Sequence, residues 1–212
     1  MQITDTVFQL EAARYSHVFF IRSDENLLID TSLPGSAGAI LAELRRLGAA
    51  PDSIRAILLT HHDVDHIGNA KRLQEATGAA LWAPGEDIPY ITGEKSRPGL
   101  KRVIGAVART GKPVLAGPYA EGQRFGEVLA LRAPGHTPGH TIFQYRDVVF
   151  TGDLFQFTGS RFRVLPGFMT WDQAALRRSL SMLKGLTFEW LCPSHGKPVR
   201  NGPAVQAFLA QF

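Results

Sequence analysis

The segment LLTHHDVDHIGN, residues 58–69, contains four side chains of the kinds that bind metal ions, all within six consecutive positions. These side chains are His61, Asp63, Asp65 and His66. They follow IRAILLT, residues 54–60, a short apolar run without the alternation of a half-buried strand. Such a run predicts a strand that is covered on both faces, so the candidate ligands stand at the end of a buried strand.

The spacing of these four residues allows them to converge. In an extended chain, side chains at positions i, i+2 and i+4 point to the same side, so His61, Asp63 and Asp65 can face one cavity. GNAKRLQEAT, residues 68–77, predicts a helix, and His66, where the chain enters this helix, can turn in from the side. One segment can therefore serve two metal ions.

Three later segments, PGHTPGH, TGDLF and PSHG, add further candidates, namely His136, Asp153 and His195. Each segment follows a predicted strand, at residues 127–133, 148–152 or 188–192. A single histidine is more often a structural residue than a metal ligand. Taken one at a time, these histidines are more simply explained as polar residues at the ends of loops, and the aspartate as a helix cap. Four His or Asp signals that all stand at strand ends favour a metal site.

The rest of the chain mixes strands and helices without a repeat or a low-complexity linker. Further strands are predicted at residues 18–22, 27–30, 79–83 and 141–145. Helices are predicted at residues 37–47, from Thr170 to Gly185 with a capping box of Thr170 and Gln173, and from Pro203 onward. We expect one domain, residues 1–212, with a lid-like insertion at about 84–126.

The predicted insertion is rich in glycine and proline, and only residues 100–108 have a helical period. Between Gly93 and Lys112 its basic residues are Lys95, Arg97, Lys101, Arg102, Arg109 and Lys112, against a single acid, Glu94. A solvated helix face is the simpler interpretation of this charge. The functional interpretation is a cationic rim that attracts anionic substrates.

Composition places the chain among ordinary globular proteins, because 44% of its 212 residues are apolar, 20% are charged and the net charge is +4. No apolar run approaches the roughly 18 residues of a membrane span, and the first residues lack the pattern of a signal peptide. The single cysteine, Cys192, cannot form an internal disulfide. We therefore expect a cytoplasmic protein without a membrane partner; the sequence does not determine the oligomeric state.

The pattern resembles the metallo-β-lactamase-fold hydrolase superfamily. The resemblance is carried, in the order typical of that family, by LLIDTSLPG with Asp30, by THHDVDH, and by GHTPGH, TGDLF and SHG. It implies an α/β fold of the αββα type, in which two mixed β-sheets are sandwiched between helices. It also implies an active site in a shallow groove at one edge of the sheets.

The resemblance further implies a dinuclear metal site. One ion would be held by His61, Asp63 and His136, the other by Asp65, His66 and His195, with Asp153 bridging the two and Asp30 supporting the ligands from behind. In that family a hydroxide between two metal ions attacks the substrate. Two divalent metal ions are therefore the expected cofactor.

This sequence departs from the family block HxHxDH at one position, where Asp63 stands in place of histidine. His62 cannot substitute, since its intervening position in an extended segment points it away from the cavity. We interpret Asp63 as a ligand, with an empty first metal site as the alternative. The third carboxylate makes the cluster formally neutral when a hydroxide is bound, which favours harder metals. Zinc is the leading prediction, and manganese or iron is the alternative.

The resulting functional prediction is a hydrolase that cleaves an ester, a thioester or a lactone of a small, possibly anionic, molecule. Asp65 is the candidate catalytic residue, because it lies beside the nucleophile and can transfer a proton to the leaving group. Cys192, at the end of an apolar strand, is predicted to be a structural thiol. Four residues could line an apolar pocket or pack in the core, namely Phe155, Phe157, Phe162 and Phe168.

Two alternative functions remain open. The first is a diiron or mono-iron oxidoreductase, similar to flavodiiron proteins or sulfur dioxygenases, because flavodiiron proteins have a carboxylate at the position of Asp63. The second is a nuclease or nucleic-acid-binding protein, which the basic insertion favours and the scarcity of stacking aromatic residues disfavours. The substrate and the roles of His17, His62 and His140 are not determined by the sequence.

Overall fold

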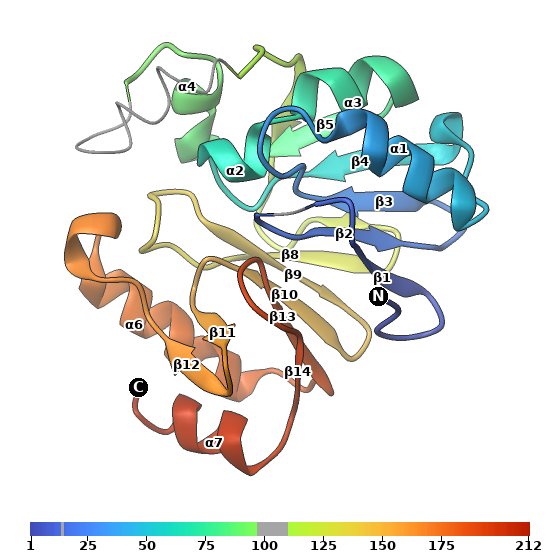
Figure 1. The fold of residues 1–212 in the computed structure, drawn as a ribbon. Coiled ribbons are helices and arrows are strands. Elements are labelled where there is room, and N and C mark those ends of the chain that lie inside the picture. The colour runs from blue at the N-terminus through green and yellow to red at the C-terminus, as the bar shows by residue number, and fades with distance from the viewer. Residues whose placement is uncertain (14, 97–109) are drawn as a thin grey trace. The chain divides into compact units, whose positions relative to one another are not determined.

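The computed structural model describes residues 1–13, 15–96 and 110–212 of the chain. They form two units, Met1–Pro118 and Tyr119–Phe212, which we describe in turn. In Figure 1 the first unit is blue and green and the second runs from yellow to red. The periodic run at 100–108 lies outside the described residues, as do four basic residues of the predicted lid, namely Arg97, Lys101, Arg102 and Arg109.

A mixed six-stranded sheet forms the middle of the first unit (Figure 1). Its strands, in spatial order, are β1 (Val7–Leu10), β2 (Val18–Ile21), β3 (Asn26–Ile29), β4 (Ile54–Leu58), β5 (Ala80–Ala83) and β6 (Leu115–Pro118). Strands β1 to β3 pair antiparallel, whereas β3 to β6 pair parallel. Because parallel strands end at the same edge of a sheet, side chains that follow successive strands can meet there.

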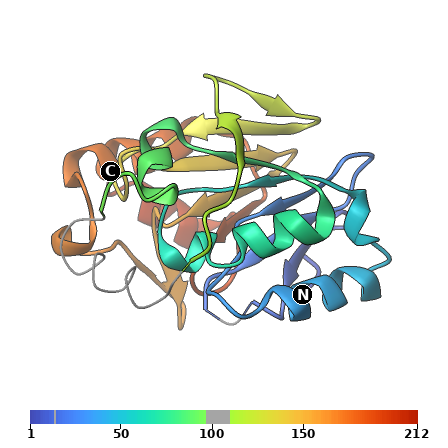
Figure 2. The ribbon, with the colours of Figure 1, turned by 90° about the horizontal axis from the view of Figure 1, so that it is seen from above.

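Helices connect the parallel strands, as parallel pairing requires. They are α1 (Ala37–Arg46), α2 (Val64–Ile67), α3 (Ala70–Thr77) and α4 (Ile88–Ile91), with 3₁₀ turns η1 (Pro51–Ser53) and η2 (Gly85–Asp87). Helices α1 and α3 lie side by side over the sheet (Figures 1 and 2). Ile40 and Leu44 of α1 and Leu73 of α3 are fully buried in the core that these helices share with the strands. The apolar spacing that predicts these helices is therefore the face that packs on the sheet.

The second unit has its own mixed six-stranded sheet. In spatial order its strands are β14 (Val199–Arg200), β13 (Trp190–Pro193), β10 (Val148–Gly152), β9 (Thr141–Tyr145), β8 (Val128–Arg132) and β7 (Arg124–Phe125). Strands β10 and β13 pair parallel and the other neighbours pair antiparallel. A separate hairpin is formed by β11 (Gln156–Thr158) and β12 (Arg161–Arg163).

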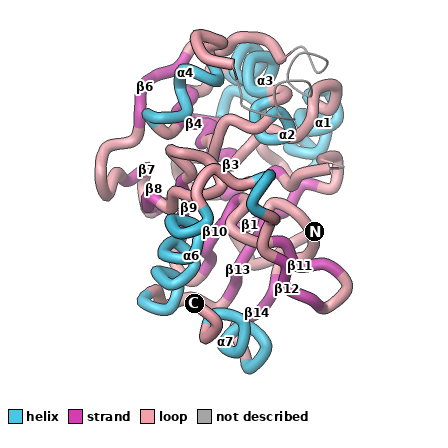
Figure 3. The backbone as a smooth tube through the Cα atoms, turned by 90° about the vertical axis from the view of Figure 1, so that its left-hand side faces the viewer, coloured by secondary structure: helices cyan, strands magenta, loops and turns pink. Residues whose placement is uncertain are grey.

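Two helices pack on the strands of the second unit (Figure 3). They are α6 (Gln173–Met182) and α7 (Pro203–Leu209), with 3₁₀ turns η3 (Gly167–Met169) and η4 (Leu183–Gly185). Leu176 and Leu180 of α6 share a buried core with Phe208 of α7. Both units are thus mixed sheets with helices packed on them, which confirms the predicted α/β class.

The predicted hairpins and central strands are present, with ends that differ by one or two residues. Strands β2 and β3 pair antiparallel, as do β9 and β10, which are joined by a tight turn at Arg146 with φ at 53°. The sequence does not predict β1, β6, β7, β11, β12 or β14, each of which has two to four residues. Strands this short are defined by their partners, which a sequence does not reveal.

Helix α6 begins later than the predicted capping box. Its cap is Asp172, whose carboxylate accepts the N–H groups of Ala174 and Ala175 at 2.8 and 3.0 Å. Thr170 lies before this cap in an extended conformation. An aspartate is as good an N-cap as threonine, and here the aspartate stands at the position where the helical backbone starts.

Of the predicted insertion, the structure describes residues 84–96 and 110–126. They form η2, α4, β6 and β7. Strand β6 belongs to the sheet of the first unit, and β7 belongs to the sheet of the second. The single domain and the lid function of this stretch stay predictions. No helix in the described part of the chain combines the length and the apolar composition that a membrane span requires.

Candidate metal centre

The first cluster of candidate ligands lies at the carboxyl edge of the parallel strands in the first unit. Asp30 follows β3 directly, and His61 comes shortly after β4, its paired neighbour. Asp63, Asp65 and His66 follow in the turn and in α2. The pairing of β3 with β4 therefore brings Asp30 close to His61 and His66, which are distant in sequence. The resemblance implies this position for Asp30, as a residue that supports the ligands.

Buried Asp30 fixes the orientation of His66. Its Oδ1 accepts the backbone N–H of Thr60 at 2.8 Å, and its Oδ2 accepts the Thr60 hydroxyl at 2.8 Å. The Nδ1 atom of His66 also lies 2.8 Å from Oδ2. Because an ionised carboxylate only accepts hydrogen bonds, this Nδ1 carries a proton and Nε2 is the nitrogen that can bind a metal.

The hydroxyl of Thr60 sets the tautomer of His61 in the same way. Its single proton is directed to Asp30, so the hydroxyl oxygen accepts a hydrogen bond from Nδ1 of His61 at 2.9 Å. The rings of His61 and His66 lie with centroids 3.9 Å apart. Both histidines thus present Nε2, the nitrogen that binds a metal when it carries no proton.

Each of these histidines has a carboxylate beside its Nε2 atom. His61 Nε2 lies 3.6 Å from Asp63 Oδ2, and His66 Nε2 lies 3.6 Å from Asp65 Oδ2. Two ligand atoms that bind one tetrahedral metal ion at about 2.1 Å lie about 3.4 Å apart. Each His-Asp pair of the first unit therefore has about the spacing of two ligands on one metal ion.

The extended geometry predicted for this segment ends at Asp63. This residue has φ −67° and ψ 149°, and its carbonyl accepts the N–H groups of His66 and Ile67 at 2.9 and 3.1 Å. Asp65 and His66 lie in α2. A short helix, rather than strand alternation, therefore places the side chain of Asp65.

The side chain of Asn69 holds the loop that follows Asp30. It bonds five backbone groups at this loop, namely the N–H groups of Gly35 and Ala37 and the carbonyls of Thr31, Ser32 and Leu33. Asp30 itself has φ at 60°, a left-handed conformation that is unfavourable for residues other than glycine. The hydrogen bonds of Asn69 help to hold this strained conformation in place.

The second cluster lies at the edge where β10 and β13 of the second unit end. These parallel strands are neighbours, with Gly152 beside Pro193. Asp153 follows the first of them and His195 follows the second, while His136 comes from the loop between β8 and β9. The parallel pairing explains why two of the predicted ligands, far apart in sequence, come together.

The carboxylate of Asp153 lies between the two histidines. Its Oδ2 is 3.6 Å from His136 Nε2, and its Oδ1 is 3.4 Å from His195 Nε2. Each oxygen therefore has its own imidazole neighbour, again at about the ligand spacing of a tetrahedral ion. This arrangement suits a carboxylate that is shared by two metal ions.

Two histidines outside the ligand set make structural contacts. His140 Nε2 accepts the backbone N–H of Asp153 at 3.0 Å, and its Nδ1 lies 3.2 Å from the carbonyl of Ala133. This pattern requires the neutral tautomer with a proton on Nδ1, and it holds Asp153 in place through its backbone. His17 lies 3.0 Å from the side-chain amide of Gln9 on the paired strand.

Two glycines allow the backbone to approach closely beside the ligands of the second unit. Gly135 has φ at 139°, and a Cβ there would lie 2.3 Å from the backbone nitrogen of Leu176. Gly196 has φ at 99°, and a Cβ there would lie 2.0 Å from the carbonyl oxygen of Phe157. Any other residue would displace the loop that carries His136 or His195.

The remaining candidates are divided between the core and the surface. Cys192 is fully buried in β13, and burial raises the pKa of its thiol, as expected of a structural cysteine. Three of the four phenylalanines named as pocket candidates, Phe155, Phe157 and Phe162, belong to or pack against the core of the second unit. Phe168, in contrast, is 82% exposed.

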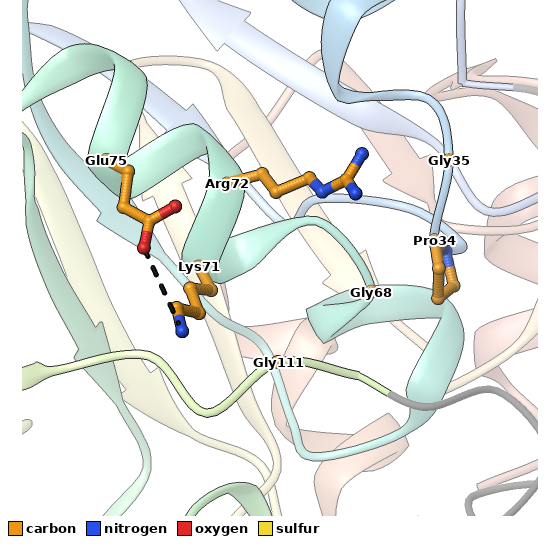
Figure 4. Close-up of a pocket in the computed structure, with 7 residues that line it drawn as sticks. All are labelled: Pro34, Gly35, Gly68, Lys71, Arg72, Glu75 and Gly111. Carbon is orange, nitrogen blue, oxygen red and sulfur yellow. Dashed lines mark ion pairs between the residues drawn. The ribbon is translucent and has the colours of Figure 1, made fainter.

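A separate open pocket of about 510 Å³ lies beside α3 in the first unit (Figure 4). It is lined by Pro34, Gly35, Gly68, Lys71, Arg72, Glu75 and Gly111. Lys71 pairs with Glu75 at 3.9 Å across one helical turn. The pocket contains none of the predicted metal ligands, so it is distinct from the metal cluster of this unit.

A model of the metallo-beta-lactamase superfamily matches residues 12–195, a span that includes all seven predicted ligands. The chain belongs to the metallo-β-lactamase superfamily. This match confirms the predicted family, and with it the prediction of a hydrolase of the metallo-β-lactamase fold.

Members of the superfamily with known names and structures are similar over most of the chain. The "Probable metallo-hydrolase YflN" of Bacillus subtilis (strain 168) is 29% identical over 87% of this chain and 81% of its own length. The hydroxyacylglutathione hydrolase of Shewanella baltica (strain OS223) is 27% identical over 76% of this chain. The alignment covers only 55% of that relative, so the chain spans about half its length.

Two solved structures of the superfamily show the same fold. BJP-1, a subclass B3 metallo-β-lactamase of Bradyrhizobium japonicum, aligns with 100% of this chain and 89% of its own, with a TM-score of 0.75 and 22% identity. TTHA1623 in a di-iron-bound form aligns with 91% of this chain and 93% of its own, with a TM-score of 0.72 and 28% identity. The predicted metallo-β-lactamase fold is thus confirmed.

Three residues around the first cluster have roles that the sequence does not predict. Gly68 and Asn69 are the first two residues of the helix predicted at 68–77, but in the structure they lie between α2 and α3, and the Gly-Asn pair is a turn signal that could have identified them. Asp87, a fully buried carboxylate in η2, lies within a stretch interpreted as a lid. No motif marks it, because its contact with the cluster depends on the pairing of β4 and β5.

Proposed function

We propose that the two clusters together hold two divalent metal ions and that this member of the superfamily hydrolyses an ester, a thioester or a lactone of a small molecule. One ion is assigned to His61, Asp63 and His136, the other to Asp65, His66 and His195, with Asp153 shared between them. The family supplies this assignment. The distances between donor atoms within each unit support it.

The observation that carries the proposal is that His Nε2 atoms face aspartate oxygens. In the first unit Asp30 and Thr60 lie on the Nδ1 side of His66 and His61, and each Nε2 atom lies 3.6 Å from a carboxylate oxygen. When Nε2 carries no proton, its lone pair and the charge of the carboxylate repel each other. A cation bound by both atoms replaces this repulsion with two attractive contacts.

The neighbouring residues orient the ligands. Asp30 and Thr60 fix the rings of His66 and His61, and His140 holds the backbone of Asp153. When bound, two divalent ions would lower the pKa of water and polarise the scissile carbonyl group of the substrate. Buried support of this kind keeps the ligands in place without the metal, so less reorganisation is needed when it binds.

Asp65 is the proposed proton carrier. Its side chain is 18% exposed, in contrast to the fully buried ring of His66 beside it. A carboxylate that borders the site and also reaches solvent can receive a proton and deliver it to a leaving group. No thiol competes for a covalent mechanism, since the only cysteine of the sequence is buried in β13.

Nitrogen and oxygen ligands suit zinc, iron and manganese. The third carboxylate, Asp63, lowers the net positive charge of the cluster and favours the harder ions. We keep zinc as the first choice for the resident metal. The di-iron form of TTHA1623, at 28% identity, supports iron as the alternative.

The hydroxyacylglutathione hydrolases support a thioester as the substrate, because a thioester is the bond that joins an acyl group to glutathione.

The second unit adds an apolar surface beside one ligand. The N–H of Trp171 donates to the carbonyl of His136 at 3.2 Å, and the Trp171 side chain is 53% exposed. Together with Phe168 it offers a contact for an apolar acyl group. The single cysteine of the chain supports action in the cytoplasm.

The test is a substrate panel with metal-loaded protein. We expect turnover of an ester, a thioester or a lactone that a chelator abolishes and added metal restores. A matched phosphodiester in the panel tests the nuclease alternative. The proposal fails if the metal-loaded protein hydrolyses none of the carbonyl substrates, or if chelation leaves the turnover unchanged.

A second candidate is an iron-dependent oxidoreductase, and the observations that favour it are the carboxylate at position 63 and the di-iron form of TTHA1623. Iron content and oxygen consumption separate it from hydrolysis. Oxygen uptake with an added electron donor or a reduced sulfur substrate, in a protein that purifies with iron, would favour this candidate. Equal hydrolysis under nitrogen and under air would favour the hydrolase.

A further inference from the structure

His62 stands between two predicted ligands, yet its ring is held by a different set of residues. Its Nδ1 lies 2.9 Å from Oδ2 of Asp87, and the same oxygen accepts the backbone N–H of His62 at 3.0 Å. The ring also stacks on Tyr90 with centroids 4.5 Å apart and an angle of 22° between the planes. Both Asp87 and His62 are buried, with at most 1% of either residue exposed.

The other nitrogen of this ring faces a predicted ligand. His62 Nε2 lies 3.7 Å from Oδ1 of Asp63, while His61 Nε2 lies 3.6 Å from Oδ2 of the same carboxylate. Both oxygens of Asp63 thus have an imidazole neighbour. The sequence predicts that His62 points away from the ligands. Its Nδ1 atom does lie beside a residue outside the predicted ligand set, Asp87, whereas its Nε2 atom lies beside the predicted ligand Asp63.

Similar distances occur twice in the first unit, although only the Nδ1 contact of His66 has the geometry of a hydrogen bond. At His66, a buried carboxylate lies 2.8 Å from Nδ1 and the Asp65 carboxylate lies 3.6 Å from Nε2. At His62, the corresponding distances are 2.9 Å to Asp87 and 3.7 Å to Asp63. A carboxylate beside Nδ1 is the usual arrangement for a histidine that binds a metal.

His62 differs from His66 in one respect. Among the described residues, His66 belongs to clusters of convergent metal-binding atoms, whereas His62 belongs to none. Its stack on Tyr90 and its contact with Asp87 hold the ring beside Asp63 rather than among the ligands. The geometry therefore suits support of a ligand better than ligation.

We propose that Asp87 and His62 are positioning residues that hold the carboxylate of Asp63 as a metal ligand. An aspartate is shorter than the histidine that the family has at this position, and its carboxylate can rotate, so it needs a neighbour that restricts it. The ring of His62, held beside Asp87 and Tyr90, lies next to Oδ1 of Asp63, whereas His61 lies next to Oδ2, and it therefore limits this rotation. The inference rests on the proposed metal site and explains how the site tolerates its unusual ligand.

The test is a titration of metal-free protein with Co²⁺, followed by calorimetry and by visible absorption. Wild type is expected to bind two equivalents. Asp87→Asn, which keeps the volume but removes the charge, is expected to weaken one equivalent about 10- to 100-fold and to leave the other unchanged. Glu86→Gln, an equal change of charge at an exposed residue of the same turn, is the matched control and should bind as wild type.

Two substitutions of His62 separate positioning from a general structural role. The amide of asparagine reaches the position of Nδ1, whereas the amide of glutamine reaches that of Nε2. We expect His62→Asn to weaken one equivalent as Asp87→Asn does, and His62→Gln to restore part of the affinity. Thermal unfolding of the metal-free variants verifies that each one folds.

Three results would overturn the inference. Two equivalents with wild-type affinity in both Asp87→Asn and His62→Asn would show that the pair does not act on the metal site. Restoration by asparagine but not by glutamine would assign His62 a structural role only. Loss of a histidine signature from the Co²⁺ spectrum of His62→Gln would make His62 a ligand. If wild type itself binds no metal, the proposed function fails together with the inference. The three results above, in contrast, overturn the inference and leave the metal site of the proposed function in place.

Discussion

Asp65 is the residue at which metal binding and proton transfer are separable. We expect Asp65→Asn to retain much of the bound metal, because the amide oxygen can still act as a ligand, and to lower kcat about 10²- to 10⁴-fold, because the amide cannot carry a proton. Steady-state kinetics and metal analysis of the same preparation are the measurements. Turnover at the wild-type rate would remove Asp65 from the mechanism.

Cys192 predicts a dependence of stability on pH. Burial raises the pKa of its thiol, so the folded chain keeps the proton at a pH where the unfolded chain, with a thiol pKa of about 8.5, releases it. The thiol therefore contributes stability below pH 8.5, and this contribution falls by about 1.4 kcal/mol for each pH unit above that value.

The measurement is urea unfolding of wild type and Cys192→Ala at pH 7.5 and pH 9.5. The variant is less stable at both values because it leaves a cavity in β13, but it should lose less stability than wild type as the pH rises. Equal losses in the two proteins would contradict the burial of the thiol.

At the scale of elements, the turn from α2 to α3 depends on a glycine. A Cβ at Gly68 would lie 2.4 Å from both the carbonyl oxygen of Ser32 and the nitrogen of Pro34, which are backbone atoms. Gly68→Ala should therefore lower the free energy of unfolding by about 1–3 kcal/mol or more and disturb the loop after Asp30. Chemical denaturation measures the change.

Gly38→Ala is the matched control. This glycine lies within α1 with no atom near the added Cβ, so the substitution should raise stability by about 0.5–1 kcal/mol through helix propensity. If Gly38→Ala lowered the stability as much as Gly68→Ala, the close approach of Gly68 to the backbone of Ser32 and Pro34 would not be the cause of the loss.

The segment between β12 and α6 is expected to determine substrate preference. Trp171→Ala should raise KM about 10-fold, or about 1.4 kcal/mol, for substrates with a long apolar acyl group and leave short acyl substrates unaffected. The exposed side chain contributes little to the core, so the unfolding temperature should change little. An equal effect on short and long acyl chains would contradict this role.

At the scale of the whole molecule, the sequence reveals those parts of the fold that depend on local pattern. Apolar runs identify the central strands, and helical spacing identifies α1, α3 and α6. The ligand candidates of the first cluster are recognisable because they lie within six residues. Asp153, His136 and His195 are recognisable because each stands in a short motif after a strand.

The remaining features depend on contacts between distant parts of the chain. The edge strands β1, β6 and β14 have four residues or fewer and are defined only by their partners. Asp87 acquires its role because β5 pairs with β4, which brings η2 to His62. The helix that places Asp65 has four residues, and no periodicity can identify an element of this length.

The central claim is that side chains of this chain hold two metal ions. Elemental analysis of protein purified from metal-replete cells, in parallel with Asp153→Asn, tests this claim most directly. The account predicts two equivalents of divalent metal per wild-type chain and fewer than two in the variant, which lacks the shared carboxylate. No bound metal in correctly folded wild type would contradict the claim.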